Sequence, residues 1–416
     1  MWKLTKVAAV AAALAAAVAA HAGEVEVLHY WTSGGEAKSA AELKKMMQAK
    51  GHTWRDFAVA GGGGDSAMTV LKSRVISGNP PSAAQVKGPA IQEWASEGVL
   101  GNMDALAKSE KWDEALPKVV ADVMKYKGNY VAAPVNVHRV NWIWASSDAL
   151  KKAGVAAMPK TWDEFFAAAD KLKAAGLIPV AHGGQNWQDF TTFESVVLGV
   201  GGPKFYQDAL VKLDDKALTS DTMKKSLETF RRIKSYTDPG APGRDWNLAT
   251  AMLIQGKAGF QLMGDWAKGE FIAAGKAPGK DFMRAAAPGT ANAFTFNVDS
   301  FILFKLKDAA AQKAQSDLAS AIMSPGFQEV FNLNKGSIPV RAGQSMDKFD
   351  DCAKASAKDF ADTAKSGGLV PSVAHGMAIA PATEGAIKDA VSQFWNDDKV
   401  SVADAMKKIA TAAKTK

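Results

Sequence analysis

The chain alternates short apolar segments with amphipathic ones, in an order typical of α/β proteins. Residues 24–29 alternate along the chain with the period of a strand, and residues 36–50 place apolar side chains on one face of a helix. Segments 52–60 and 82–88 predict two further strands, with a helix between them. This succession favours a mostly parallel sheet that is covered by helices.

The middle of the chain is mainly helical and is punctuated by proline and glycine. Thr161 predicts the N-cap of one such helix, and Gly176 predicts its end. An apolar strand is predicted within 256–267, and 294–305 predicts a strand pair or a bent strand. From about residue 343 the pattern is again mainly helical.

Two segments have the composition of crossings between two lobes, one at 128–150 and a return near 291–299. After such crossings each lobe consists of separate pieces of sequence, and a ligand lies between the lobes, outside the carboxyl ends of the strands. The predicted division is a signal peptide over 1–22, an N-terminal lobe of 23–133 with 294–341, and a C-terminal lobe of 134–293 with 342–416.

The first 22 residues have the pattern of a secretory signal peptide. Lys3 and Lys6 precede an apolar run from Val7 to Ala20, and Ala20-His21-Ala22 matches the small-x-small cleavage pattern. The run has 14 residues, fewer than the ~20 that span a bilayer. We therefore expect an exported protein, with a mature chain long enough for two hydrophobic cores.

Composition and charge narrow the classes of function. Apolar residues make up 47% and charged residues 22%, as in ordinary globular proteins, and the formal net charge is +7. Lysines lie mostly on predicted helix faces, and no basic run is interleaved with aromatics, so we expect no nucleic-acid partner. Cys352 is the only cysteine, and the six histidines form no HExxH pair. We therefore expect no metal and no cofactor.

The run Gly61–Gly64 precedes a predicted helix, with Asp65 as a plausible N-cap. No Gly-Lys-Ser/Thr sequence follows, so the run is not a Walker phosphate loop. Two roles stay open for it. One is a flexible turn that leads into a helix, and the other is a close approach of the backbone to a ligand.

Aromatic residues recur next to amide, carboxylate or lysine groups at the ends of predicted strands. Tyr30 and Trp31 follow the first strand and precede Glu36, and Asp299 lies inside the predicted strand pair. A sugar ring has an apolar face of C–H groups that an indole covers, and an edge of hydroxyls that charged or planar polar groups bind. The pattern therefore indicates a carbohydrate site.

Six stretches of sequence, in order along the chain, carry a pattern known from one family: LHYWTSGGE, GGGGDSAMTVLKSRVISGNPPSAAQVKG, RDWNLATAMLIQGKAGFQLMGDWA, FNVDSF, NKGSIPVR and VAHGMA. Together they resemble periplasmic sugar-binding proteins of ABC importers (extracellular solute-binding protein family 1), in particular the glucose/mannose-binding type. The resemblance implies a two-lobe α/β fold that closes over a monosaccharide. That sugar would be glucose, or else mannose or galactose, and a monomeric protein would deliver it to an inner-membrane ABC permease.

The resemblance also implies which residues bind the ligand. One position departs from the family, because Tyr30 stands where related sequences carry a second tryptophan, which adds a hydroxyl to the stacking surface. The choice between His138 and Asn141, and between Trp246 and Trp266, stays open. The implied ligand-binding residues are Tyr30, Trp31, Glu36, Gln85, Lys87, His138, Asn141, Trp246, Trp266, Asp299, Lys335 and His375.

Other functions stay open beside this one. A binding protein for an oligosaccharide or an acidic sugar would suit Lys87 and Lys335. A secreted glycoside hydrolase would need two carboxylates that face each other roughly 5 to 9.5 Å apart. The candidate carboxylates are accompanied by lysine and histidine partners suited to holding hydroxyls, so we expect a binding protein and no enzyme. A further role as the ligand of a chemoreceptor also stays open.

Overall fold

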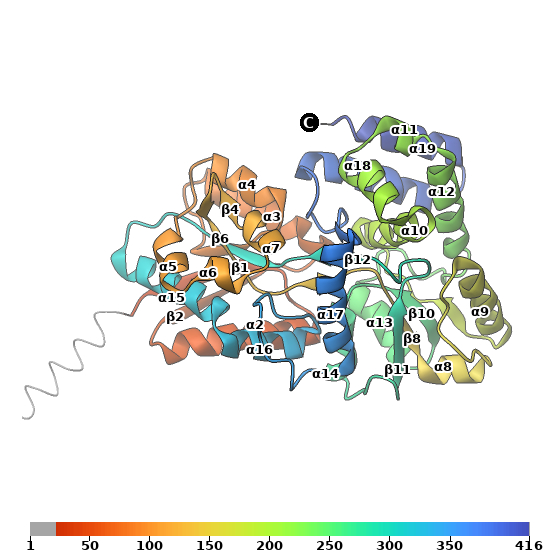
Figure 1. Ribbon diagram of the computed structural model, residues 1–416, viewed down its shortest axis with the longest axis horizontal. Coiled ribbons are helices and arrows are strands. Elements are labelled where there is room, and N and C mark those ends of the chain that lie inside the picture. Colours follow the sequence, from red (N-terminus) through yellow and green to blue (C-terminus); the bar gives the residue numbers. More distant parts are fainter. Residues whose placement is uncertain (1–21, 416) are drawn as a thin grey trace, which may run out of the picture.

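The protein is described by a computed structural model in which residues 22–415 are placed. The predicted signal peptide lies outside these residues apart from Ala22. Figure 1 shows two lobes of strands and helices, the first built mainly from red and orange N-terminal segments and the second from yellow and green ones. No helix within the described residues is both long and apolar enough to cross a membrane.

The first lobe is built on a five-stranded sheet of order β2-β1-β3-β13-β6. β1 pairs in parallel with β2 and β3, whereas β13 pairs antiparallel with β3 and β6. The strands are β1 (Glu24–His29), β2 (Thr53–Ala58), β3 (Ala83–Gln85), β6 (Ala132–Pro134) and β13 (Ser300–Leu303), with a small hairpin of β4 (Lys125–Tyr126) and β5 (Asn129–Tyr130) beside them. The helices are α2 (Gly34–Ala49), α3 (Asp65–Ile76), α4 (Pro89–Ser96), α5 (Asp104–Ser109), α6 (Trp112–Ala115), α7 (Lys118–Val123), α15 (Ala309–Met323) and α16 (Pro325–Lys335).

The second lobe is built on a four-stranded sheet of order β11-β8-β10-β9. Its strands are β8 (Trp142–Ser146), β9 (Ile178–Val180), β10 (Ala258–Leu262) and β11 (Phe282–Ala286). Its helices are α8 (Ser147–Lys152), α9 (Trp162–Ala174), α10 (Asn186–Tyr206), the π-helical η2 (Gln207–Val211), α11 (Asp215–Leu218), α12 (Asp221–Lys234), α13 (Trp246–Ile254), α14 (Trp266–Ala273), α18 (Pro381–Asn396) and α19 (Val402–Ala412). Both sheets are mixed, because strands that arrive by a crossing run against their neighbours.

A three-stranded sheet of order β14-β12-β7 lies where the chain passes between the lobes. Its strands are β7 (His138–Arg139), β12 (Phe294–Asn297) and β14 (Leu369–Pro371), and α17 (Asp351–Ser366) packs beside it (Figure 1). The predicted strand pair over 294–305 is present as β12 and β13, but the two strands belong to different sheets. The predicted lobe boundaries after 133, 293 and 341 stay a prediction.

Two helix starts show how local sequence sets an element boundary. The Thr161 hydroxyl accepts a hydrogen bond from the Glu164 N–H (3.2 Å), so the predicted N-cap of α9 is confirmed. The expectation that Asp65 caps α3 is wrong, because Gly64 takes that position and Asp65 is the first helical residue. Gly64 has φ +115°, a left-handed conformation that glycine adopts without steric cost.

Asn141, on the crossing segment 128–150, forms hydrogen bonds to the returning segment at residues 290–295. Its amide Nδ2 donates to the Thr290 hydroxyl (3.0 Å) and to the Ala293 carbonyl (3.1 Å). Its Oδ1 accepts from the Thr295 backbone N–H (3.0 Å). All of these groups are buried, so the side chain replaces water for polar groups that have no other access to it.

We expect Asn141→Ala to lower the free energy of unfolding by about 2 to 3 kcal/mol, because it leaves the buried Thr295 N–H without a partner and removes two further buried hydrogen bonds. Urea unfolding followed by circular dichroism measures the change. Asn129→Ala is the matched control, because Asn129 is exposed in the β4–β5 hairpin and its loss should cost within about 0.5 kcal/mol. Equal stability of the two variants would contradict this account of the crossing.

Candidate ligand-binding site

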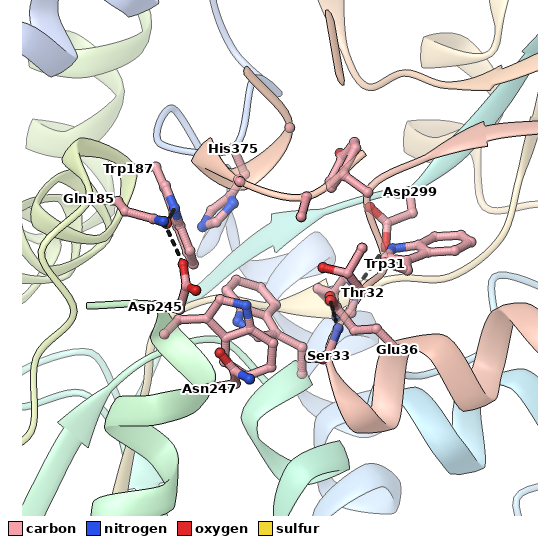
Figure 2. A pocket seen from close by; sticks show the side chains of 18 of the residues that line it. Trp31, Thr32, Ser33, Glu36, Gln185, Trp187, Asp245, Asn247, Asp299 and His375 are labelled. Atoms are coloured by element: carbon pink, nitrogen blue, oxygen red, sulfur yellow. Dashed lines mark hydrogen bonds and ion pairs between the residues drawn. The ribbon is translucent and has the colours of Figure 1, made fainter. Parts of the chain in front are cut away.

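A cavity of about 330 Å³ lies between the two lobes. This volume is at the small end of the roughly 300–1,000 Å³ that small-molecule sites span. Figure 2 shows Trp31, Glu36 and Asp299 on one side of the cavity and Gln185, Trp187 and Asp245 on the other. Many of the lining side chains come from the segments after strands and from the first turns of helices, where an α/β fold gathers functional groups.

The structure brings most of the predicted site residues together. Gln85 and Asn141 are the two that it does not place at the cavity wall, which corrects the expectation for both. Asn141 belongs to the crossing described above, and Gln85 is buried behind Asp299. The predicted residues that line the cavity are Tyr30, Trp31, Glu36, Lys87, His138, Trp246, Trp266, Asp299, Lys335 and His375.

The two aromatics after β1 support the wall of the first lobe. Neighbouring residues of an extended chain point to opposite sides. Trp31 accordingly packs in the core, with its ring 5.5 Å from that of Phe301 and 5.0 Å from that of Phe331, and it also lines the cavity. Tyr30 lies against the backbone of Gly64, where an added Cβ would be 3.0 Å from its ring. Both aromatics therefore line the site, in different ways.

Each lysine at the cavity has a carboxylate partner. Lys335 forms an ion pair with Glu36, and its ammonium lies 5.9 Å from the centre of the Trp31 ring. Lys87 Nζ lies 3.9 Å from Asp299 Oδ1 and 5.4 Å from the centre of the Tyr30 ring. Burial lowers the pKa of the Lys87 ammonium, and the charge of Asp299 acts against that shift.

His138 bridges two buried carboxylates. Its Nδ1 bonds to Asp265, and its Nε2 lies 3.0 Å from Asp299 Oδ2. Burial alone would lower the pKa of His138, but the two carboxylates outweigh it and the pKa lies above its ordinary value. Burial likewise opposes the charge on Asp299, yet the hydrogen bond and charge of His138, with Lys87 and Lys335, hold the pKa of that carboxyl well below its usual range. A carboxylate at each ring nitrogen therefore favours the protonated ring, which can donate to both.

Gln85 fixes this wall from behind. Its amide Nε2 donates to Asp299 Oδ1 (3.2 Å), and its Oε1 accepts from the Tyr30 backbone N–H (3.2 Å). A fully buried amide with both ends bonded holds one orientation. Gln85 therefore acts on two lining residues without lining the cavity itself.

Aromatic rings form the opposite wall. The Trp266 ring lies 5.2 Å from the His138 ring and 4.9 Å from the His375 ring, edge-on to both, and 6.4 Å from the Trp187 ring. Trp246, at the first turn of α13, completes the wall. Both Trp246 and Trp266 thus reach the cavity. Burial and the charge of Lys87 lower the pKa of His375 well below its ordinary value, so this ring is neutral at pH 7.

The site contains residues that the sequence analysis did not select. Trp187 Nε1 donates to Gln185 Oε1 (2.7 Å), and Gln185 Nε2 donates to Asp245 Oδ1 (2.6 Å), as the dashed line in Figure 2 marks for the latter pair. Gln185 and Trp187 follow β9, so an aromatic beside an amide at a strand end would have identified them. Asn297 also lines the cavity, and its buried Oδ1 has no hydrogen-bond partner within residues 22–415, which leaves an acceptor for a ligand.

The backbone of the glycine run 61–64 makes a close contact, but with the side chain of Trp187 in the second lobe. Gly63 has φ +61°, and a Cβ on it would lie 2.9 Å from Cγ of Trp187. Gly61, Gly63 and Gly64 all line the cavity. The backbone of the run therefore closes one side of the cavity against the indole of Trp187, as only glycine permits.

The chemistry of the cavity suits a small polar ligand without net charge. Its lysines and His138 each lie beside a carboxylate, its aromatic rings offer an apolar face, and hydrogen-bonding groups lie among the rings. Within residues 22–415, no group of three or more His, Cys, Asp or Glu side chains is placed to hold a metal ion.

The chain belongs to the family of bacterial extracellular solute-binding proteins, which it matches over residues 31–319. A protein of Rhizobium meliloti named "Probable sugar-binding periplasmic protein" is 49% identical over 96% of each chain. A protein of Brucella suis with the same name is 47% identical over 99% of each chain. The two-lobe fold is that of solved solute-binding proteins. A chitin oligosaccharide binding protein superimposes with a TM-score of 0.79 at 19% identity, covering 94% of this chain and 98% of the other.

Because His138 lies between two carboxylates, it should stabilise the folded protein more at low pH than at high pH. The folded pKa lies above that of an unfolded histidine, about 6.5, so the stabilisation is complete below that pH. It is lost as pH rises through the folded pKa. We therefore expect His138→Gln to cost more unfolding free energy at pH 5.5 than at pH 8.5, measured by urea unfolding at both. A cost independent of pH would show that the fold does not raise the pKa of this ring, and a larger cost at pH 8.5 would show that the fold lowers it.

Proposed function

We propose that this protein binds a monosaccharide in the periplasm with high affinity and delivers it to an inner-membrane ABC permease. Glucose is the proposed ligand, with mannose or galactose as alternatives. The observation that carries the proposal is the cavity itself, in which aromatic rings alternate with charge pairs that are complete without a ligand. The names of the relatives, probable sugar-binding periplasmic proteins, support the sugar and the compartment.

The size of the cavity favours a monosaccharide over a longer sugar. At about 330 Å³ it leaves little room beyond one ring and its hydroxyls. The fold alone does not set this size, since one solved structure of the same fold is a chitin oligosaccharide binding protein. Another is a solute receptor described as having an exclusive substrate preference for β-D-galactopyranose, with a TM-score of 0.78 at 19% identity over 94% of this chain and 98% of that one.

The pairing of charges favours a neutral sugar over an acidic one. Lys335 is paired with Glu36, and Lys87 is close to Asp299 and Tyr30, so neither lysine needs an anionic ligand. A uronate would have to displace one of these carboxylates or lie unpaired beside it, at the cost of burying a charge. Neutral hydroxyls can bond to both members of each pair.

The same pairing argues against a glycoside hydrolase. A general acid needs a carboxyl whose pKa is raised towards the working pH. Among the lining carboxylates, Asp299 has a pKa held far below its usual range, mainly by His138 against the effect of burial. Membership in a solute-binding family agrees with a binding role. We further infer that the protein works as a monomer, as the resemblance to the family implies.

Isothermal titration with D-glucose tests the proposal, with mannose, galactose, maltose and glucuronate as comparisons. The protein should first be unfolded and refolded, so that any sugar carried through purification is removed. We expect one site per chain with a micromolar or lower Kd, which corresponds to about −8 kcal/mol or better. Trp246→Ala should weaken binding at least tenfold, because it removes part of the aromatic wall.

Trp94→Ala is the matched control for this titration. Trp94 is partly buried on α4, where its ring packs 6.0 Å from that of Phe304 and does not reach the cavity. We expect its Kd for glucose to equal that of the wild type. Binding of glucuronate in preference to glucose would replace the neutral-sugar proposal, and no binding of any sugar in the panel would refute the monosaccharide proposal.

The contact between Gly63 and Trp187 predicts a second effect on affinity. Gly63→Ala places a methyl group 2.9 Å from the indole and strains a positive φ, so it should hold the lobes apart and weaken glucose binding at least tenfold. Gly78→Ala is the matched control, because Gly78 has φ +73° and an added Cβ meets nothing within 4 Å. Equal affinities of the two variants in the same titration would show that the cavity does not depend on this contact.

A further inference from the structure

Glu194 is a buried carboxylate that forms no ion pair within residues 22–415. Its Oε2 accepts from the backbone N–H groups of Val373 (2.9 Å) and Ala374 (3.1 Å) and from the Tyr206 hydroxyl (2.8 Å). Its Oε1 accepts from the Ser372 hydroxyl (2.6 Å). Four donors from two separate segments therefore converge on one side chain that solvent does not reach.

Three of these donors belong to one tight turn, residues 372–377. The turn is closed by the Met377 N–H, which donates to the Ser372 carbonyl (2.9 Å). It carries His375 into the wall of the cavity. It also places the carbonyl of Gly376 against Gly88 of the first lobe, where an added Cβ would be 2.0 Å from that oxygen. The position of this turn therefore affects both the ligand wall and the contact between the lobes.

One face of α10 contacts this turn along its length. Trp187, Thr191 and Glu194 have the spacing that aligns side chains on a helix. The Trp187 ring lies 5.7 Å from the His375 ring, and the Thr191 hydroxyl lies 3.0 Å from His375 Nε2. Because that hydroxyl donates to the Trp187 carbonyl (2.8 Å), it accepts from His375 Nε2–H, which leaves Nδ1 as the acceptor of the neutral ring.

We propose that Glu194 is a positioning residue of the binding site, whose ionised carboxylate fixes the 372–377 turn and thereby the place of His375 and the lobe contact at Gly376. The ionised form suits this place because the two backbone N–H groups of the turn can only donate, and the Tyr206 hydroxyl, which also lies 2.9 Å from the Pro371 carbonyl, and the Ser372 hydroxyl add to them. Protonation would remove the charge that strengthens the bonds to the two N–H groups and would loosen the turn. The ligand in this inference is that of the proposed function.

This arrangement makes sugar binding dependent on pH. Burial raises the pKa of Glu194 to about 7, against the effect of its four donors. The one titratable group among its partners is Tyr206, whose pKa burial and Glu194 raise well above the ordinary value, so it stays neutral. On the other side of the turn, Glu384 lies against Gly376, where an added Cβ would be 3.3 Å from its Oε2, and burial raises the pKa of that carboxyl against the effect of Lys388. Burial and the charges of Lys87 and Lys388 hold the pKa of His375 well below its ordinary value.

The test is the Kd for D-glucose between pH 5.5 and 8.5. With a pKa of about 7, only about a tenth of the wild-type protein is ionised at Glu194 at pH 6, so binding should be about tenfold weaker there than at pH 8. Glu194→Gln should bind weakly at every pH and lose the profile. Ser372→Ala keeps the carboxylate but removes one donor, so its profile should persist with the midpoint moved to higher pH.

A second measurement does not need the sugar. In the ligand-free protein the His375 ring signals, followed by NMR, should shift with a midpoint near pH 7, and Glu194→Gln should abolish that midpoint. If the wild type binds no glucose at pH 8, the proposed function fails and this midpoint alone decides the inference. A pH profile or an NMR midpoint that survives in Glu194→Gln would overturn the role of Glu194 and assign the effect to another group, such as His138.

Discussion

The burial of charge at the junction of the lobes is the constraint on which the rest of the structure depends. An ionised carboxylate inside a protein is tolerated only with partners that compensate for the lost water. Asp299 has such partners in His138, Lys87 and Gln85, and His138 is held in turn by Asp265. These groups come from segments far apart in sequence, so the charges are satisfied only when the crossings, both lobes and the cavity are formed together.

The same arrangement makes the cavity polar while its lysines and His138 stay paired with carboxylates of the protein. Carboxylates and cations are set against each other before a ligand arrives, so the field in the cavity is local and alternating. Hydroxyl groups, which donate and accept, match such a field, whereas a net charge does not. The aromatic rings on the opposite wall then supply the apolar contact that distinguishes a sugar ring from water.

Much of the fold could be predicted from local sequence. The strands 24–29 and 53–58 lie in the predicted segments, and α9 begins after Thr161, because these features depend on neighbours in the chain. Pairing between distant segments could not be predicted. The apolar pattern of segment 294–305 predicts two strands whether they pair with each other or belong to different sheets. Their assignment to different sheets depends on distant strands, with which each of them pairs.

The residues of the candidate site could likewise be predicted only in part from the sequence. Residue types at strand ends pointed to the cavity, since parallel strands bring their carboxyl ends together. Gln85 has the right position but faces inward behind Asp299, and Asn141 satisfies backbone groups of the returning strand. Whether a polar side chain faces the cavity or the layer behind it depends on neighbours that no local pattern contains.

The place of β13 in its sheet has a consequence for the order in which the protein can fold. β13 lies between β3 and β6, although residues 300–303 come long after both in the chain. As the chain emerges during synthesis, β6 has no strand to pair with, and the edge of β3 stays open, until about three-quarters of the protein has been made. The lobe that is begun first is therefore completed late, after the second lobe has its whole sheet.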